Sequence, residues 1–321
     1  MDILIYLIQN TLPVMIPLLL VALGGMFSER SGVINIALEG IMLIGAFIGT
    51  LCVFFVQGSG MDPQMILLIG MLAAAVAGIV YSLLLGVAAI HLKADQTISG
   101  TALNMFAPAI MLLVCKMAFM SDGVTTNVAF YIQKIPVLGD IPFIGELFFQ
   151  KTYLTVAIGI VILIVSTIFL YKTKLGLRLR ACGEHPQAAD SVGINVYKMR
   201  YLGVCLSGFL GGIGGFFYAV SIMDGNSNGH TGVAGFGFLA LAVMIFGQWK
   251  PVSIFFAALF FAFLRTVAYS VPLIPFLAAL GIDNAIYKML PYIVTMIILA
   301  FTSKKSRAPK AEGIPYDKGQ R

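Results

Sequence analysis

Charged residues are scarce in this sequence. Asp, Glu, Lys and Arg make up 11% of its 321 residues, whereas 60% of the residues are hydrophobic. A mean hydropathy of +0.98 with so little charge excludes an ordinary soluble domain. Cysteine is also rare, and the four residues present, Cys52, Cys115, Cys182 and Cys205, form no Cys-x-x-Cys pair. We therefore expect neither structural disulfides nor a metal site.

The sequence also lacks the motifs of common enzymes. It contains no Gly-x-x-x-x-Gly-Lys-Ser/Thr loop, so the chain is not expected to hydrolyse ATP. It contains no His-Glu-x-x-His motif, nucleophile elbow or paired-carboxylate arrangement either. The net charge of +6 lies in loops that flank apolar segments and in the tail, which argues against a nucleic-acid partner. The prediction is a chain that is not an enzyme and holds no cofactor.

Runs of about 20 apolar residues, the length that crosses a bilayer, fill most of the chain. They predict an all-α, polytopic membrane protein with about nine hydrophobic segments (eight to ten, because several look discontinuous). Residues 1–302 would form the transmembrane domain, and the charged residues 303–321 a disordered tail. No cleavable signal is expected, since the first segment has no basic region before it. The segments are 3–27, 32–56, 64–91, 96–119, 152–171, 201–222, 232–248, 251–272 and 284–302.

The longest polar stretch, residues 172–200, sets the expected orientation. It carries six Lys and Arg residues against Glu184 and Asp190. Short loops rich in Lys and Arg stay in the cytoplasm. Counting crossings from this loop puts the N-terminus outside, the C-terminus inside and the turn-rich residues 120–151 outside.

A short helix is expected at the centre of this loop. Pro186 suits a first helical position, and Gly193 suits the stop after the helix. A compact helix that projects from the membrane would dock on another protein. From charge alone, a solvated connector is the alternative.

Two motifs resemble a known family. The first is Gly176-Leu-Arg-Leu-Arg-Ala-Cys-Gly-Glu-His-Pro, followed by Ala188-Ala189 and Ser191-Val-Gly-Ile-Asn. It resembles the coupling loop of permease subunits of ABC importers for branched-chain amino acids, ribose-type sugars and nucleosides. The second, Phe27-Ser-Glu-Arg-Ser-Gly-Val-Ile-Asn-Ile-Ala-Leu-Glu-Gly-Ile-Met, is similar to the nucleoside branch. The resemblance covers roughly residues 20–300.

This resemblance implies a set of partners. They are a homologous second permease, a cytoplasmic ATPase that carries ATP and Mg, and an extracellular solute-binding lipoprotein docked near residues 120–151. The location implied is the bacterial plasma membrane, among its lipids. The residues expected to couple the chain to the ATPase are Arg180, Gly183, Glu184, Ala188, Ala189 and Gly193.

Polar residues inside apolar segments are candidates for a substrate path. Asn35 and Glu39 lie four residues apart, hence on one helical face, and an acid there normally faces the bundle interior or a wet cavity. A second group lies where a helix restarts after residue 94. Structural pairing of Glu39 and ordinary helix capping are the alternatives, and Arg265 could either snorkel or line the path. The path candidates are Asn35, Glu39, Asp95, Thr97, Ser99 and Asn104.

Together these observations predict a permease subunit that imports nucleosides by alternating access. The same machine for a ribose-type sugar or a branched-chain amino acid is the first alternative. An amino acid would require charged partners, whereas the internal polar residues here are mostly neutral. A second alternative, from another class, is an ion-driven secondary transporter with Glu39 and Asp95 as its ion sites. A scaffold protein is disfavoured, because buried polar groups would then cost stability without a use.

Overall fold

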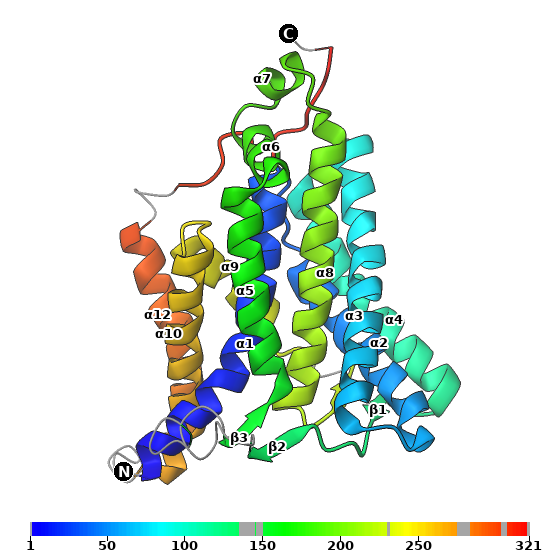
Figure 1. Cartoon of the computed structure of the whole chain (residues 1–321), viewed down its shortest axis with the longest axis vertical. Helices are drawn as coiled ribbons and strands as arrows, with labels where there is room; N and C mark the ends of the chain where they lie inside the picture. The colour runs from blue at the N-terminus through cyan, green and yellow to red at the C-terminus, as the bar shows by residue number, and fades with distance from the viewer. Residues whose placement is uncertain are drawn as a thin grey trace.

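The computed structural model describes residues 2–134, 145, 150–229, 232–274, 283–302 and 307–319. Its long helices run side by side along the longest axis of the molecule (Figure 1). The helices α6 (Lys174–Glu184) and α7 (Pro186–Ser191) and residues 307–319 gather at one end, here called the loop end. The N-terminus and the strands gather at the opposite end, the strand end (Figure 1).

Two helices form the centre of the bundle. In α1 (Asp2–Arg30) and α8 (Val196–Ile222), 89% and 83% of the most apolar stretch is buried. The other helices surround this pair and expose more apolar surface, as expected of helices that face lipid or another subunit. They are α2 (Leu38–Val56), α3 (Pro63–Gly86, continued by a π turn Val87–His91), α4 (Gln96–Phe119), α5 (Leu154–Lys172), α9 (Phe236–Phe246), α10 (Pro251–Tyr269) and α12 (Asn284–Thr302).

Glycines let α8 approach its neighbours closely. A Cβ added at Gly212 would overlap the backbone of Ala74 and Gly78 in α3, and one at Gly215 would overlap the Met42 carbonyl of α2. Membrane helices associate through such close contacts, because lipid gives them no hydrophobic driving force. A larger residue at either position would push α8 away from its neighbours.

The prediction of nine hydrophobic segments is met only in part. Among the described residues, seven helices are long and apolar enough to cross a membrane. The predicted segment 232–248 contains only the 11-residue α9, and 284–302 contains a shorter apolar stretch, Ala285–Ile297. Because a helix rises 1.5 Å per residue, α9 spans only about half of a bilayer core.

Short strands at the strand end depart from the all-α prediction. Strand β1 (Gly123–Thr125) pairs antiparallel with β4 (Asn226–Asn228). Strand β2 (Tyr131–Lys134) pairs with β3 (Gln150–Tyr153). These pairs anchor the predicted external segment 120–151, of which residues 135–144 and 146–149 lie outside the described part.

The tail also differs from the expectation of disorder. Residues 307–319, here called the strap, run across the loop end in specific contact with it; residues 303–306 and 320–321 lie outside the described part. The Ala311 N–H donates to the Gly183 carbonyl (2.9 Å), and the Gly313 N–H donates to the Gly32 carbonyl (3.3 Å). Tyr316 is 5% exposed and packs with Cys182. Apolar contacts and backbone hydrogen bonds fix the strap despite its charged composition.

Candidate translocation site and coupling surface

The carboxylate of Glu39 caps the start of the half-length helix α9. The N–H groups of Gly235 and Gly237 donate to Glu39 Oε1 (2.9 Å) and Oε2 (2.7 Å). A negative charge at a helix N-terminus satisfies free N–H groups and favours the helix dipole. This contact is a structural pairing of the kind that the sequence left open for Glu39, and its place on a substrate path stays a prediction.

Asn35 and Asn104 hold the connection between α1 and α2. The Asn104 side chain accepts from the Gly40 N–H (2.8 Å) and donates to the Ile36 carbonyl (2.8 Å). Asn35 is fully buried, and its Nδ2 donates to Ser207 Oγ (2.8 Å) in α8. These amides replace the backbone hydrogen bonds that the non-helical residues 31–37 lack within the bundle.

The remaining path candidates lie at the start of α4. Asp95 accepts from the Ile98 N–H (2.8 Å), and Ser99 Oγ donates to the Asp95 carbonyl (2.7 Å). Asp95 and Thr97 are exposed, and Ser99 is half-buried. The geometry is that of an ordinary helix cap.

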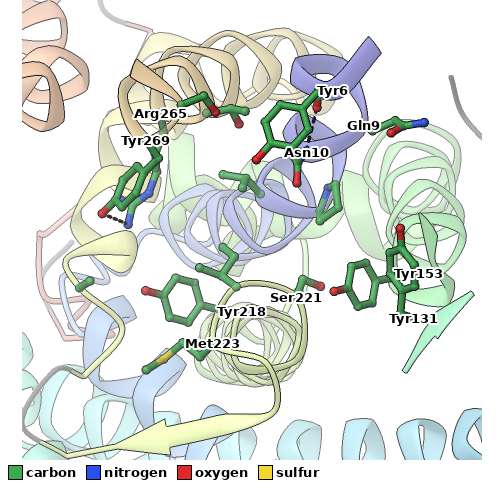
Figure 2. A pocket seen from close by; sticks show the side chains of 16 residues that line it. Tyr6, Gln9, Asn10, Tyr131, Tyr153, Tyr218, Ser221, Met223, Arg265 and Tyr269 are labelled. Atoms are coloured by element: carbon green, nitrogen blue, oxygen red, sulfur yellow. Dashed lines mark hydrogen bonds between the residues drawn. The ribbon is translucent and has the colours of Figure 1, made fainter. Parts of the chain in front are cut away.

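A cavity of about 600 Å³ opens near the strand end, between α1, α8, α10 and strands β2 and β3. None of the six path candidates lines it. Its walls combine tyrosine rings with amide and hydroxyl groups and the guanidinium of Arg265 (Figure 2). The labelled residues are Tyr6, Gln9, Asn10, Tyr131, Tyr153, Tyr218, Ser221, Met223, Arg265 and Tyr269.

Sequence reasoning missed this cavity because its residues come from distant parts of the chain. Helix α1 contributes Tyr6 and Asn10, α8 contributes Tyr218, and α10 contributes Arg265 and Tyr269. One signal was available: the ends of several apolar segments carry tyrosine and amide residues at the same predicted side of the membrane. Pockets of this size and mixed lining are typical sites for small molecules.

Arg265 lies at one end of the cavity. Its guanidinium carbon is 4.0 Å from the centre of the Phe236 ring and 5.2 Å from that of Tyr269. Its Nη2 donates a long hydrogen bond of 3.4 Å to Tyr269 Oη (Figure 2). Arg265 therefore lines this cavity, and its place on the substrate path stays a prediction.

The predicted coupling residues occur together at the loop end. Pro186 begins α7 as its first residue, and Gly193 follows the helix with a φ of +83°, which confirms the predicted short helix and its stop. Ala189 is buried against Cys182, whereas Ala188 and Gly193 are exposed. The exposed side of α7 is available to another protein.

Helix α6 ties this loop to the membrane helices. Gly183 packs on the backbone of Arg30, and Glu184 Oε1 lies 3.6 Å from Arg30 Nη1. Arg180 stacks on the Tyr171 ring at the end of α5 (5.2 Å). A displacement of α6 and α7 would therefore be transmitted to both α1 and α5.

These features define a class of protein: a polytopic membrane protein with a polar, aromatic cavity at one end and a loop of two short helices, α6 and α7, at the other. The chain matches the family described as "Branched-chain amino acid transport system / permease component" over residues 7–299. It belongs to this family of permease components. It is therefore a multi-pass membrane subunit of an ABC transport system, and it is a transport component rather than an enzyme.

Two similar relatives align over nearly the whole chain. The guanosine ABC transporter permease protein NupQ of Bacillus subtilis is 45% identical, covering 100% of this chain and 99% of the relative. The nucleoside ABC transporter permease protein NupC of Lactococcus lactis is 41% identical, covering 98% and 97%. A second Lactococcus lactis permease, NupB, is 26% identical. No solved structure matches the chain.

Proposed function

We propose that this chain is the membrane subunit of an importer that moves nucleosides across a bacterial plasma membrane. The relatives that align over its full length are named for guanosine and nucleoside transport. The residues of the cavity suit such a cargo: tyrosine rings can stack on a base, and amide and hydroxyl groups can bind ribose. This combination of rings and neutral polar groups is the observation that carries the proposal.

In the proposed orientation the loop end is cytoplasmic and the strand end faces outward. Lys and Arg cluster in the loop of residues 172–200, as the positive-inside rule requires. The N-terminus and the strap lie at opposite ends of the bundle, which supports an N-terminus outside (Figure 1). The cavity then opens toward an extracellular binding lipoprotein.

The partners follow from this orientation. A cytoplasmic ATPase holds ATP and Mg and docks on α6 and α7, and a homologous permease completes the channel. The similarity to NupB of Lactococcus lactis supports a pair of unequal permeases. The proposed coupling residues act as one unit, in which Gly183 and Glu184 transmit motion to Arg30, and Arg180 transmits it to Tyr171.

The mechanism follows the geometry. Closure of the ATPase moves α7, and α6 carries the motion into α1 and α5. Helix α1 also lines the cavity through Tyr6 and Asn10, so its movement changes the shape of the site. The path candidates Asn35, Glu39 and Asn104 hold the broken backbone in place. Asp95 and Ser99 form hydrogen bonds at the start of α4, where Thr97 is exposed.

Uptake of labelled nucleosides tests this proposal. Cells with and without the gene are compared, with ATP depleted while the proton gradient is held. Loss of ATP-dependent uptake on deletion supports the proposal. Unchanged nucleoside uptake, with ATP-dependent loss of a labelled sugar instead, would contradict the cargo. Uptake that follows the ion gradient would contradict the ATP-driven mechanism.

A further inference from the structure

Arg265 is buried without a carboxylate partner among the described residues. Its side chain is 8% exposed and lies over the Phe236 and Tyr269 rings. No acidic oxygen of the described part lies within 4.0 Å of it. Glu39 is within electrostatic reach, but its two oxygens accept from Gly235 and Gly237. A buried cation normally has an acceptor.

The donors of Arg265 are consequently available to a ligand. Within the described part, its one hydrogen bond is the long contact of 3.4 Å to Tyr269 Oη. A guanidinium carries several N–H donors in a planar fork and no acceptor. The fork therefore suits a ligand edge with two neighbouring acceptors.

An aromatic surface lies beside these donors. Tyr269 is 56% exposed and lines the same cavity as Arg265, and Lys288 Nζ lies 5.1 Å from the centre of its ring. Tyr218 also lines the cavity and packs edge-on against Phe236, with ring centres 4.6 Å apart. A planar ring could thus stack on a tyrosine while its edge meets the guanidinium (Figure 2).

We propose that Arg265 reads the edge of a purine base in this cavity and makes the site select 6-oxopurine nucleosides over 6-aminopurine nucleosides. Guanine and hypoxanthine present two acceptors, O6 and N7, which match the fork. Adenine presents N7 beside an amino group, whose N–H bonds oppose those of Arg265. This inference rests on the proposed nucleoside transport and goes beyond it in assigning the discriminating residue.

The buried position of Arg265 sharpens the selectivity. The Phe236 ring is fully buried and packs edge-on against Tyr218, so the cation resting on this ring has little freedom to turn away from an amino group. Bound adenosine would leave both its amino N–H and an N–H of Arg265 without an acceptor. Bound inosine would instead accept from Arg265 through O6 and N7.

Initial uptake rates of guanosine, inosine and adenosine in cells with the complete transporter test the inference. The variants are Arg265→Gln, which removes the cation, and Arg265→Lys, which keeps the charge without the fork. The binding lipoprotein is the same in all strains. Its own preference among nucleosides therefore cancels when the uptake ratio of each variant is divided by the uptake ratio of the wild-type transporter. We expect the ratio of guanosine to adenosine uptake to fall about tenfold in R265Q and to fall in R265K as well.

Ser270→Ala is the matched control. Ser270 lines the same cavity and is buried, and its hydroxyl could bind only the ribose that all three nucleosides share, so its loss changes their uptake together without changing the Arg265 edge. Its ratio should equal that of wild type. The amount of the permease in the membrane and its association with the ATPase are measured in every strain. If R265Q does not assemble with the ATPase, the uptake ratio of R265K tests the inference.

The outcomes separate this inference from the proposed function. A wild-type transporter that moves none of the three nucleosides contradicts the function itself. A wild-type transporter that moves them, with an unchanged ratio in the Arg265 variants, overturns the role of Arg265 alone. A fall in the ratio of equal size in S270A would also overturn it, since any change to the wall would then have the same effect.

Discussion

Glu39 in α2 and Gly237 in α9 are joined by a hydrogen bond of 2.7 Å from the glycine N–H to the carboxylate Oε2. The two residues are almost 200 positions apart in the chain. The bond fixes the start of a half-length helix within the bundle, where no water replaces a missing partner. It also holds Phe236, on which the cavity residue Arg265 rests.

Replacing Glu39 with alanine should therefore destabilise the protein. The N–H groups of Gly235 and Gly237 would lose their acceptors, at a cost of roughly 1–3 kcal/mol for each buried donor. Thermal inactivation of the purified complex measures the loss. Asp62→Ala, which removes a cap at the exposed start of α3, is the control and should cost less. Equal effects of the two changes would contradict the structural role of Glu39.

Substitutions at Gly193 should affect coupling according to backbone conformation. Its φ is +83°, and a Cβ there would meet no atom of the described chain within 4 Å. Val disfavours this region by about 1–2 kcal/mol, whereas Asn tolerates it. We expect Gly193→Val to abolish ATP-driven uptake with normal membrane insertion, and Gly193→Asn to retain most of it. Loss in both would indicate a contact with the ATPase instead, and normal uptake by G193V would refute the coupling role.

Removal of the strap should expose Cys182. This thiol is fully buried beside Tyr316, and burial raises its pKa to about 11. A chain ending at residue 306, with the other three cysteines replaced, should react with a maleimide at least tenfold faster than the full-length chain. Tyr316→Ala should act in the same direction.

Asp317→Ala is the control for that experiment. It breaks the exposed contact to Lys93 Nζ (2.7 Å), and exposed ion pairs contribute little to stability. Labelling should stay close to that of the full-length chain. Fast labelling in the unaltered chain would show that the strap does not cover Cys182.

The strap should loosen as the pH rises. Burial raises the pKa of Glu312 above its ordinary value of 4.5, and its carboxyl shares a hydrogen bond with that of Glu29. The contribution of protonated Glu312 to the stability of the docked strap is fully present below pH 4.5. It is lost as the pH rises through the raised pKa. The ratio of Cys182 labelling in wild type to that in Glu312→Gln should rise across this interval. A constant ratio would contradict the role of Glu312.

The sequence predicted those parts of the fold that depend on local pattern. Apolar runs located the long helices, and Pro186 with Gly193 located α7, because a proline start and a glycine stop act through the backbone alone. The roles of Glu39 and Asn104 could not be predicted, since their partners lie elsewhere in the chain. The pairs of short strands carry no periodic signal, and residues 307–319 have the composition of a disordered tail.

The cavity was missed for a related reason. Its tyrosines are singly placed at the ends of different helices, where tyrosine is common at any membrane interface. Only the packing of α1, α8 and α10 shows that Tyr6, Tyr218 and Arg265 share one space.

The strap has a consequence for how the protein is made. Its residues follow every long helix of the described part, yet they contact Gly32, Gly183 and Gln248, which lie much earlier in the chain. The loop end is therefore completed only after the strap itself has been made. A chain that stops before the strap would contain all these long helices and still present an unfinished surface to the ATPase. Assembly of the transporter would in this way depend on residues that lie outside the membrane helices.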